Sequence, residues 1–278
     1  MTLLHYTAFS TDPAGGNPAG VVLDAAGMSD AEMLAVAAEV GYSETAFLMS
    51  GAADGAIPIR YFSPQAEVPF CGHATVATAV ALAERVGPGE LTFATPAGVV
   101  PVVVEQGPDG LRATLTSVEP YVEAAGDVSE ALALLGWQSD QLDAALPPRV
   151  AYAGARHLVL AAATRERLAA LEYDFDGLRA YMLEHDLTTL QLVWRESPTV
   201  FHVRDPFPVG GVVEDPATGA AAAAFGAYLR ELGLAHPPAT IQLRQGDDLG
   251  RPSRITVELR DDDNRVRVSG YAVPMEPA

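Results

Sequence analysis

The sequence contains no lysine, because all 17 basic residues of the 278-residue chain are arginines. Enzymes that use pyridoxal phosphate normally hold the cofactor as a Schiff base on a lysine. The phosphate-binding P-loop also needs a lysine, which reaches the β- and γ-phosphates. The chain therefore carries neither kind of site.

Cysteine is almost as scarce, since Cys71 is the only one in the chain. A single thiol excludes a disulfide framework, a cysteine-type zinc site and any mechanism that needs two thiols. The six histidines are scattered without a His-Glu-x-x-His pair, and no Gly-x-Ser-x-Gly elbow occurs. The sequence therefore predicts no metal site, no cofactor and no serine hydrolase.

The formal net charge of −19 argues against nucleic acid or an anionic membrane as a partner. No segment has the pattern of a signal peptide or of a membrane-spanning helix, so we expect a cytoplasmic protein. The length is sufficient for two modest domains, each with a core of its own.

The chain is organised around the stretch from Pro69 to Gly87. Residues 76–86 have a helical pattern that is apolar on almost every side, which is typical of a helix enclosed within its own domain. This helix is too short to cross a bilayer, and Gly87 followed by Pro88 ends it. We therefore predict a central core helix here.

The same pattern returns about half a chain-length later, where Ala217–Gly233 aligns with Cys71–Gly87 without a gap. The repetition predicts an α+β protein of two pseudo-symmetric domains. We place these domains at residues 1–119 and 120–278, and we leave open a return of the final strand to the first domain. The N-termini of the two core helices would then open on one cleft, where their N–H groups favour an anion such as a substrate carboxylate.

Local signals predict the other elements. Ser29 and Glu32 form a capping-box pattern at the start of a helix that should run from 30 to 40 and end at Gly41. The other helices are expected at 128–135, 165–171 and 177–185. Strands are expected at 1–10, 21–23, 45–49, 59–64, 90–94, 98–105, 111–116, 150–152, 157–162, 190–194, 199–203, 239–244, 254–260 and 265–270.

Three ionisable residues are candidates for catalysis. Glu44 lies just before the strand at 45–49, where partial desolvation would raise the pKa of its carboxyl toward the range of a general base. His73 and Asp215 lie at the mouths of the two core helices, where each is either a cap or a functional residue. The glycine-rich loop around Asn17 lacks the Gly-x-Gly-x-x-Gly spacing of a dinucleotide site, and is either a plain turn or the border of an active site.

Four sequence blocks together resemble the phenazine-biosynthesis PhzF-like family, relatives of diaminopimelate epimerase. In chain order, the blocks are Gly16-Asn17-Pro18-Ala19-Gly20-Val21-Val22, Ser43-Glu44-Thr45-Ala46-Phe47, Cys71-Gly72-His73-Ala74-Thr75 and Glu214-Asp215-Pro216-Ala217-Thr218-Gly219. A weaker fifth block combines Gln245-Gly246 with Gly250-Arg251-Pro252-Ser253. Together they extend over nearly the whole chain.

The resemblance implies two similar domains, each a curved, barrel-like sheet around a central helix. It also implies a cofactor-independent isomerase that moves a proton between carbons of a small unsaturated or amino acid, as PhzF-type dihydro-hydroxyanthranilate isomerases do. Glu44 matches the family's acid/base, and His73 and Asp215 match its other catalytic, substrate-contacting residues. The matching substrate-binding positions are Asn17, Gly72, Thr218 and Gly219. We further expect a homodimer.

One departure concerns Ala220, which stands where the family commonly has a serine. A serine hydroxyl at this position could form a hydrogen bond with a substrate, and alanine cannot. The phenazine precursor itself is therefore in doubt as the substrate. Two other functions stay open. One is a racemase or epimerase that uses Asp215 or Glu44 in place of one thiol. The other is a non-catalytic binding or scaffold protein with an exposed Glu44. Cys71 is expected to be a buried, non-catalytic thiol, since free cysteine packs as a small apolar residue.

Overall fold

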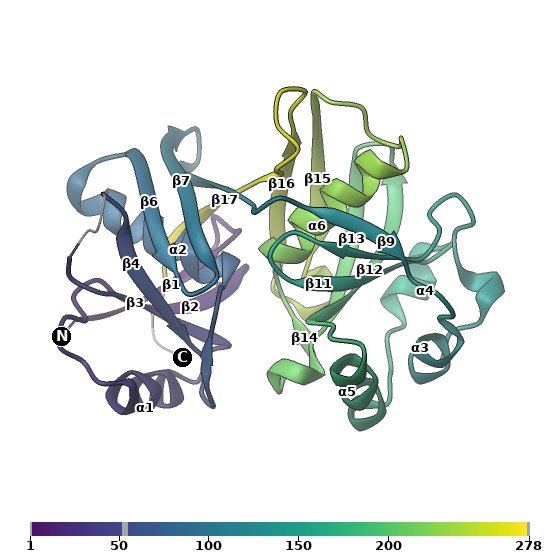
Figure 1. Ribbon diagram of the computed structural model, residues 1–278, viewed down its shortest axis with the longest axis horizontal. Coiled ribbons are helices and arrows are strands. Elements are labelled where there is room, and N and C mark those ends of the chain that lie inside the picture. Colours follow the sequence, from purple (N-terminus) through teal and green to yellow (C-terminus); the bar gives the residue numbers. More distant parts are fainter. Residues whose placement is uncertain (1, 52–54, 277–278) are drawn as a thin grey trace. The chain divides into compact units, whose positions relative to one another are not determined.

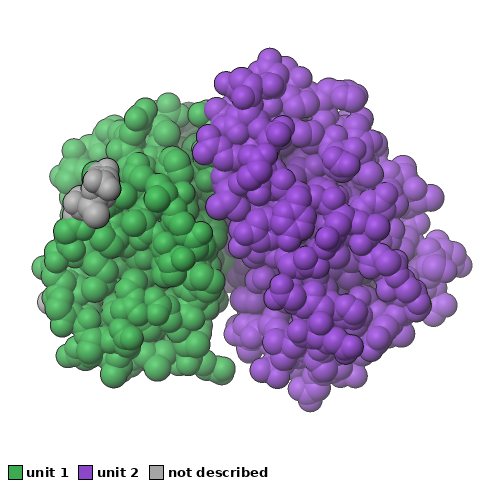
Figure 2. All heavy atoms as spheres, viewed as in Figure 1, with its two compact units in different colours: residues 1–116, 267–278 green, residues 117–266 purple. Residues whose placement is uncertain are grey.

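The computed structural model of the chain describes residues 2–51 and 55–276. It divides into two compact units, residues 1–116 with 267–278 and residues 117–266 (Figure 2). The chain first passes from unit 1 to unit 2 after residue 116, whereas the sequence analysis placed this boundary after residue 119. The last strand lies in unit 1.

Among the described residues of unit 1, eight strands pair edge to edge into a closed ring (Figure 1). In ring order they are β1 (Leu3–Ala8), β2 (Asn17–Val22), β3 (Glu44–Leu48), β4 (Ile57–Phe62), β6 (Gly89–Thr95), β7 (Gly98–Gly107), β8 (Gly110–Thr116) and β17 (Arg267–Pro274), which pairs again with β1. The β2–β3 and β4–β6 pairs are parallel, and the other pairs are antiparallel. A two-residue strand, β5 (Glu67–Val68), pairs with β4.

Helix α2 (Gly72–Val86) lies within this ring and contacts β1, β2, β3, β7, β8 and β17. Its residues are buried from the first position to Ala81, as the sequence predicted. Small alanine and valine side chains let strands approach the helix from every side. The buried hydroxyls of Thr75 and Thr78 donate to the carbonyl oxygens of Cys71 and Ala74 at 2.6 and 2.7 Å, so they carry no unsatisfied donor into the core.

Helix α1 (Asp30–Val40) packs against β3 and β4. Ser29 and Glu32 form the predicted capping box, and Gly41 ends the helix with a φ of 70°. Because most of α1 is exposed, only a narrow face contributes to the core. The buried residues of this small core are Val22, Ala25, Met33, Ala37, Phe47 and Phe62.

Unit 2 is built from a sheet with the strand order β9 (Tyr121–Ala124), β10 (Arg149–Tyr152), β11 (Arg156–Ala161), β12 (Thr189–Ser197), β13 (Val200–Pro206), β15 (Ala239–Gln245) and β16 (Ser253–Leu259). The two-residue strand β14 (Glu214–Asp215) pairs with the end of β13. Helix α6 (Gly219–Glu231) packs on β9, β10, β11, β12 and β16.

The remaining helices of unit 2 are α3 (Ser129–Leu134), α4 (Arg165–Ala169) and α5 (Phe175–Glu184), and they share a second core with β10, β11 and β12. Three short 3₁₀ turns are η1 (Ser139–Gln141), η2 (Pro208–Gly210) and η3 (Asp247–Leu249). No helix in the described residues is both long enough and apolar enough to span a membrane.

The two units repeat one pairing scheme. In unit 1 the antiparallel pair β1–β2 is followed by the outer helix α1 and by β3, which pairs parallel to β2. In unit 2 the antiparallel pair β10–β11 is followed by the outer helices α4 and α5 and by β12, which pairs parallel to β11. Next in unit 1 come β4, antiparallel to β3, then the two-residue strand β5, the buried helix α2, and β6, parallel to β4. The same order in unit 2 is β13, antiparallel to β12, then the two-residue strand β14, the buried helix α6, and β15, parallel to β13. The predicted α+β fold of two similar barrel-like units is confirmed, whereas the twofold relation between them stays a prediction.

The helix boundaries correct one detail of the repeat. Helix α2 begins at Gly72 and α6 begins at Gly219, so the N-cap residue Cys71 is equivalent to Thr218. The gapless alignment had paired it with Ala217. The sequence analysis also missed β5, β9 and β14, because strands of two to four residues are too short to show a readable alternation of apolar and polar residues.

Candidate active site

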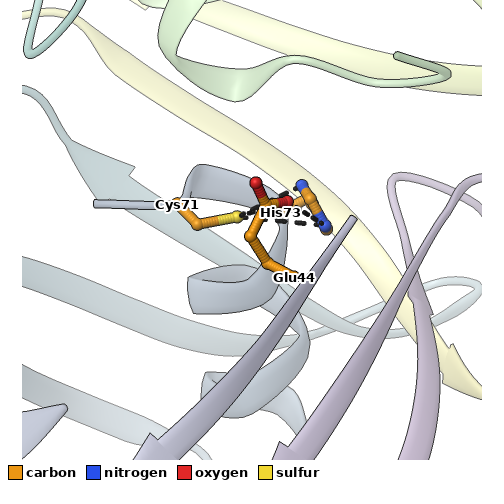
Figure 3. Close-up of side chains that lie close together, drawn as sticks. All are labelled: Glu44, Cys71 and His73. Carbon is orange, nitrogen blue, oxygen red and sulfur yellow. Dashed lines mark hydrogen bonds and ion pairs between the residues drawn. The ribbon is translucent and has the colours of Figure 1, made fainter. Parts of the chain in front are cut away.

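Glu44, Cys71 and His73 meet at one point in unit 1 (Figure 3). The Cys71 thiol donates to Oε2 of Glu44 across 3.5 Å, and Nε2 of His73 lies 3.5 Å from the same oxygen. The Cys71 sulfur is also 3.3 Å from Nδ1 of His73. One carboxylate oxygen therefore faces a thiol and an imidazole together.

Two adjoining elements hold these side chains in place. Glu44 is the first residue of β3 and pairs with Ala19 of β2, whereas Cys71 is the N-cap of α2 and His73 belongs to its first turn. The hydroxyl of Tyr61 lies 2.6 Å from Oγ1 of Thr75, and Thr75 binds the Cys71 carbonyl. The start of α2 is thus fixed against β4.

The loop before β2 brings Asn17 into the same cluster. Gly16 has a φ of +68°, and a Cβ there would lie 2.5 Å from the carbonyl oxygen of Ala8, so the turn requires glycine. The Thr7 hydroxyl donates to the Gly15 carbonyl at 2.6 Å and fastens the loop. Nδ2 of Asn17 consequently lies 3.1 Å from Nδ1 of His73.

The cluster is nearly closed to solvent, with Glu44 8%, Cys71 7% and His73 4% exposed. Burial lowers the pKa of the His73 imidazole below its usual value, and the Glu44 carboxylate and a hydrogen bond to the Pro18 carbonyl only partly oppose this effect. The ring is therefore neutral at pH 7. A neutral imidazole can donate from one nitrogen and accept at the other.

The N-termini of the two buried helices differ from those of three outer helices, α1, α4 and α5. Ser29, Thr164 and Asp174 cap α1, α4 and α5 through their side chains. In the described part of the chain, neither Cys71 nor Thr218 provides a side-chain cap for α2 or α6. First-turn N–H groups of this kind favour an anion.

At the mouth of α6 in unit 2, Asp215 is 5% exposed and belongs to β14. The Thr218 hydroxyl donates to Oδ2 of Asp215 at 2.6 Å. Gln245 holds the turn from both sides, because its Nε2 donates to the Asp215 carbonyl and its Oε1 accepts from the Thr218 N–H. Gly219 is the first residue of α6, with Ala220 next.

Sequence reasoning missed Asp205, which is fully buried on β13 beside Asp215. Burial raises the pKa of the Asp205 carboxyl well above its usual value, and the charges of Asp215 and Glu214 add to this effect against hydrogen bonds from neighbouring side chains. With its amide nitrogen turned inward, Gln191 donates to Oδ1 of Asp205 at 2.8 Å. Burial therefore favours the protonated, neutral form of Asp205.

The structure brings four of the predicted site residues together in unit 1, namely Asn17, Glu44, Gly72 and His73, and three in unit 2, namely Asp215, Thr218 and Gly219. The burial of Cys71 is as predicted, but its contacts with Glu44 and His73 were not foreseen. Convergence of the two sets in one cleft stays a prediction, as do the catalytic and binding roles.

Comparison with known proteins settles the family. A family model described as "Phenazine biosynthesis-like protein" matches residues 6–278. The chain belongs to this family. The resemblance inferred from the four sequence blocks is confirmed.

The relatives extend over almost the full length of the chain. The "Uncharacterized isomerase YddE" of Escherichia coli (strain K12) is 35% identical, with 97% of this chain and 94% of the relative covered. The trans-2,3-dihydro-3-hydroxyanthranilate isomerase of Pseudomonas chlororaphis is 31% identical, with 97% and 96% covered. A crystal structure of a PhzF-family protein from Bacillus anthracis has a TM-score of 0.87 at 27% identity, with 99% and 98% covered. The chain is accordingly an isomerase of the PhzF type.

Proposed function

We propose that the chain isomerises a small unsaturated carboxylic acid without a cofactor, with Glu44 as the group that moves the proton. Glu44 would take a proton from one carbon of the substrate and return it to another while the double bond shifts between them. The molecular formula of the substrate is unchanged. One carboxylate is sufficient for both steps.

The observation that carries the proposal is the surroundings of Glu44. In the described part of the chain, Glu44 has no arginine partner, and its carboxylate faces only the Cys71 thiol and the neutral His73 ring. A carboxylate that no cation neutralises stays available for proton transfer. With 8% of its surface exposed, Glu44 is largely shielded from bulk water, which argues against the scaffold alternative, for which an exposed Glu44 was expected.

The neighbouring groups suit the charge that develops on the substrate. Removing a proton beside a conjugated acid builds negative charge, which the uncapped first turn of α2 at Gly72 and the donor nitrogen of His73 can stabilise. Asn17 fixes the orientation of the His73 ring. The same N–H groups would bind the substrate carboxylate, which supports an anionic substrate.

The substrate class follows from the relatives and from one residue of this chain. One relative is named for trans-2,3-dihydro-3-hydroxyanthranilate, an unsaturated amino acid. Ala220 supplies no hydroxyl to bind such a molecule, so we propose a related small acid as substrate. The roles of Asp215, Thr218 and Gly219 as substrate contacts, the homodimer and the cytoplasmic location remain predictions of the sequence analysis.

The test is solvent deuterium exchange on trans-2,3-dihydro-3-hydroxyanthranilate and on a panel of small unsaturated and amino acids. Glu44→Gln should slow exchange by about 100-fold or more, because a general acid/base contributes at least that much. The matched control is Glu84→Gln, the same substitution in the last turn of α2, where Glu84 accepts a hydrogen bond from Tyr6. Exchange that survives Glu44→Gln would place the base elsewhere.

A second candidate is a racemase in which Cys71 and Glu44 act as two proton-transfer groups. Both groups are buried in one site, and the substrate carbon would have to enter between them in place of their 3.5 Å contact. We expect Cys71→Ala to retain most of the exchange that Glu44→Gln abolishes. An equal loss in both variants, together with inversion of a stereocentre, would support the racemase instead.

A further inference from the structure

Two buried aspartates face each other at the mouth of α6. Asp205 of β13 and Asp215 of β14 are directly opposite in an antiparallel strand pair, so both side chains lie on one face, with Cβ atoms about 4.5–5.5 Å apart. Asp205 is fully buried and Asp215 is nearly so. Two ionised carboxylates opposed in this way repel each other, and burial removes the water that would screen them. The pair therefore needs a compensating cation or a proton.

The neighbouring arginine compensates a different carboxylate. Arg204, which precedes Asp205 in β13, donates from Nε and Nη2 to Glu214 at 3.0 and 2.5 Å. Its Nη1 donates to the Ala169 carbonyl at 2.7 Å. Adjacent residues of a strand point to opposite faces, so the Arg204 guanidinium is directed away from the face that carries Asp205. A proton is left as the means of relieving the pair.

The hydroxyl of Thr218 connects the two aspartates and has one hydrogen to give. It donates to Oδ2 of Asp215 at 2.6 Å and accepts from Nε2 of Gln245 at 3.0 Å. The same hydroxyl is a hydrogen-bond partner of the Asp205 carboxyl. Because its hydrogen is already given to Asp215, the contact with Asp205 is satisfied only when Asp205 is the donor. Such a donor is a carboxylic acid that keeps its proton.

Of the two aspartates, Asp205 is the better placed to keep the proton. Burial raises the pKa of the Asp205 carboxyl well above its usual value, and the charges of Asp215 and Glu214 act in the same direction. Asp215 instead lies beside the first turn of α6, whose N–H groups receive no side-chain cap from Thr218 and favour an anion. Gln191 donates to Oδ1 of Asp205 at 2.8 Å, which is compatible with a hydrogen on the other oxygen.

We propose that Asp205 is a positioning residue for Asp215. Its acid O–H donates to Oγ1 of Thr218, and Thr218 donates to Oδ2 of Asp215, so that two hydrogen bonds in series fix the Asp215 carboxylate at the mouth of α6. Gln245 holds the middle of this chain, because its Nε2 donates both to the Thr218 hydroxyl and to the Asp215 carbonyl. Each hydrogen stays on its own oxygen, and no proton is transferred.

The consequence for activity rests on the proposed function, in which Asp215 contacts the substrate. An ionised, fixed Asp215 presents a hydrogen-bond acceptor to an O–H or N–H group of the substrate. When rising pH removes the proton of Asp205, two carboxylates compete for the single Thr218 hydrogen and repel each other. Asp215 then loses its fixed orientation, and activity falls. The protonation of Asp205 does not depend on any activity, so the two statements need separate measurements.

Protonation is measured by infrared spectroscopy on the protein without substrate. A protonated carboxyl group has a carbonyl band that a carboxylate lacks, and the band shifts in D₂O. We expect the difference between wild type and Asp205→Asn at pH 7 to contain one such band, and Asp215→Asn to retain it. The proposal is overturned if Asp205→Asn removes no band, or if Asp215→Asn removes it, because the proton would then not belong to Asp205.

Activity is measured by deuterium exchange against pH, on trans-2,3-dihydro-3-hydroxyanthranilate first and otherwise on the acid of the same panel that wild type exchanges fastest. Wild-type exchange should fall with the midpoint at which rising pH removes the infrared band. Asp205→Asn keeps a donor toward Thr218 at every pH, so this fall should be absent. Asp205→Val lacks the donor, and its KM at pH 7 should rise about 3- to 10-fold, the worth of one hydrogen bond, with kcat changed less.

The matched control is Asp176→Asn, the same substitution at an exposed position of α5, which should follow the wild-type profile. If Asp205→Val does not fold, the comparison between wild type and Asp205→Asn decides. Exchange that stays constant while the band disappears, or an Asp205→Asn profile that falls in parallel with wild type, would overturn the positioning role. If the band behaves as expected and Asp215→Asn exchanges as fast as wild type, the protonated Asp205 stands and the substrate contact of Asp215 is refuted.

Discussion

His157 makes the stability of unit 2 depend on pH. Its side chain is fully buried on β11, between β10 and β12, and its Nδ1 lies 2.8 Å from the Thr189 hydroxyl. Nε2 of His157 has no hydrogen-bond partner within the described residues. Burial lowers the pKa of the His157 imidazole from 6.5 to about 3, because the charged ring would lose its hydration without gaining a partner.

The direction of the effect follows from proton binding. Between pH 6.5 and pH 3 the unfolded chain binds a proton at His157 and the folded unit does not, so the free energy of unfolding falls as the pH falls. Each pH unit below 6.5 costs about 1.4 kcal/mol, which gives about 2 kcal/mol at pH 5. The loss of about 2 kcal/mol at pH 5 is the same for any folded-state pKa of His157 that lies well below 5.

Tryptophan fluorescence isolates the relevant unit, because Trp137 and Trp194 are the only tryptophans and both lie in unit 2. Urea unfolding should show that His157→Gln loses about 2 kcal/mol less than the wild-type chain between pH 7 and pH 5. The control His185→Gln, at an exposed histidine, should retain the wild-type dependence. Parallel curves for wild type and His157→Gln would refute the buried neutral imidazole.

The core helices could be predicted from sequence because their signal is local. A run that is apolar on every side and ends in glycine can only be enclosed, and α2 and α6 occupy such positions. The capping box at Ser29 likewise depends on residues within one turn. The closure of the ring could not be predicted in this way, because the pairing of β17 with β1 joins opposite ends of the chain.

Part of the candidate site could be predicted because its sequence signal is also local. Glu44 and His73 belong to recognisable sequence blocks, but the contact between Glu44 and Cys71 bridges 27 residues and depends on how α2 enters the ring. Asp205 was missed because an aspartate followed by proline is typical of a turn. The available signal was the alternation of β13, which places Phe201, Val203 and Asp205 on one face.

Three further predictions concern unit 2 and use the same tryptophan signal. Gly226→Ala should destabilise the unit by about 1–3 kcal/mol although alanine favours helices, because the new Cβ would lie 2.6 Å from Val257; an unchanged urea midpoint would contradict this packing. Arg204→Met should cost about 3–5 kcal/mol, since it leaves Glu214 buried without its partner at 2.5 Å, and adding Glu214→Gln should restore part of the loss. Asp205→Asn tests the protonated acid. Because the folded-state pKa of Asp205 is raised, the folded unit binds the extra proton, and wild-type stability must fall as the pH rises above the unfolded value of 3.8. The amide cannot ionise, so Asp205→Asn should gain stability relative to wild type between pH 4 and pH 8, and a variant that is equally destabilised at both pH values would mean that the carboxyl is ionised in the folded protein.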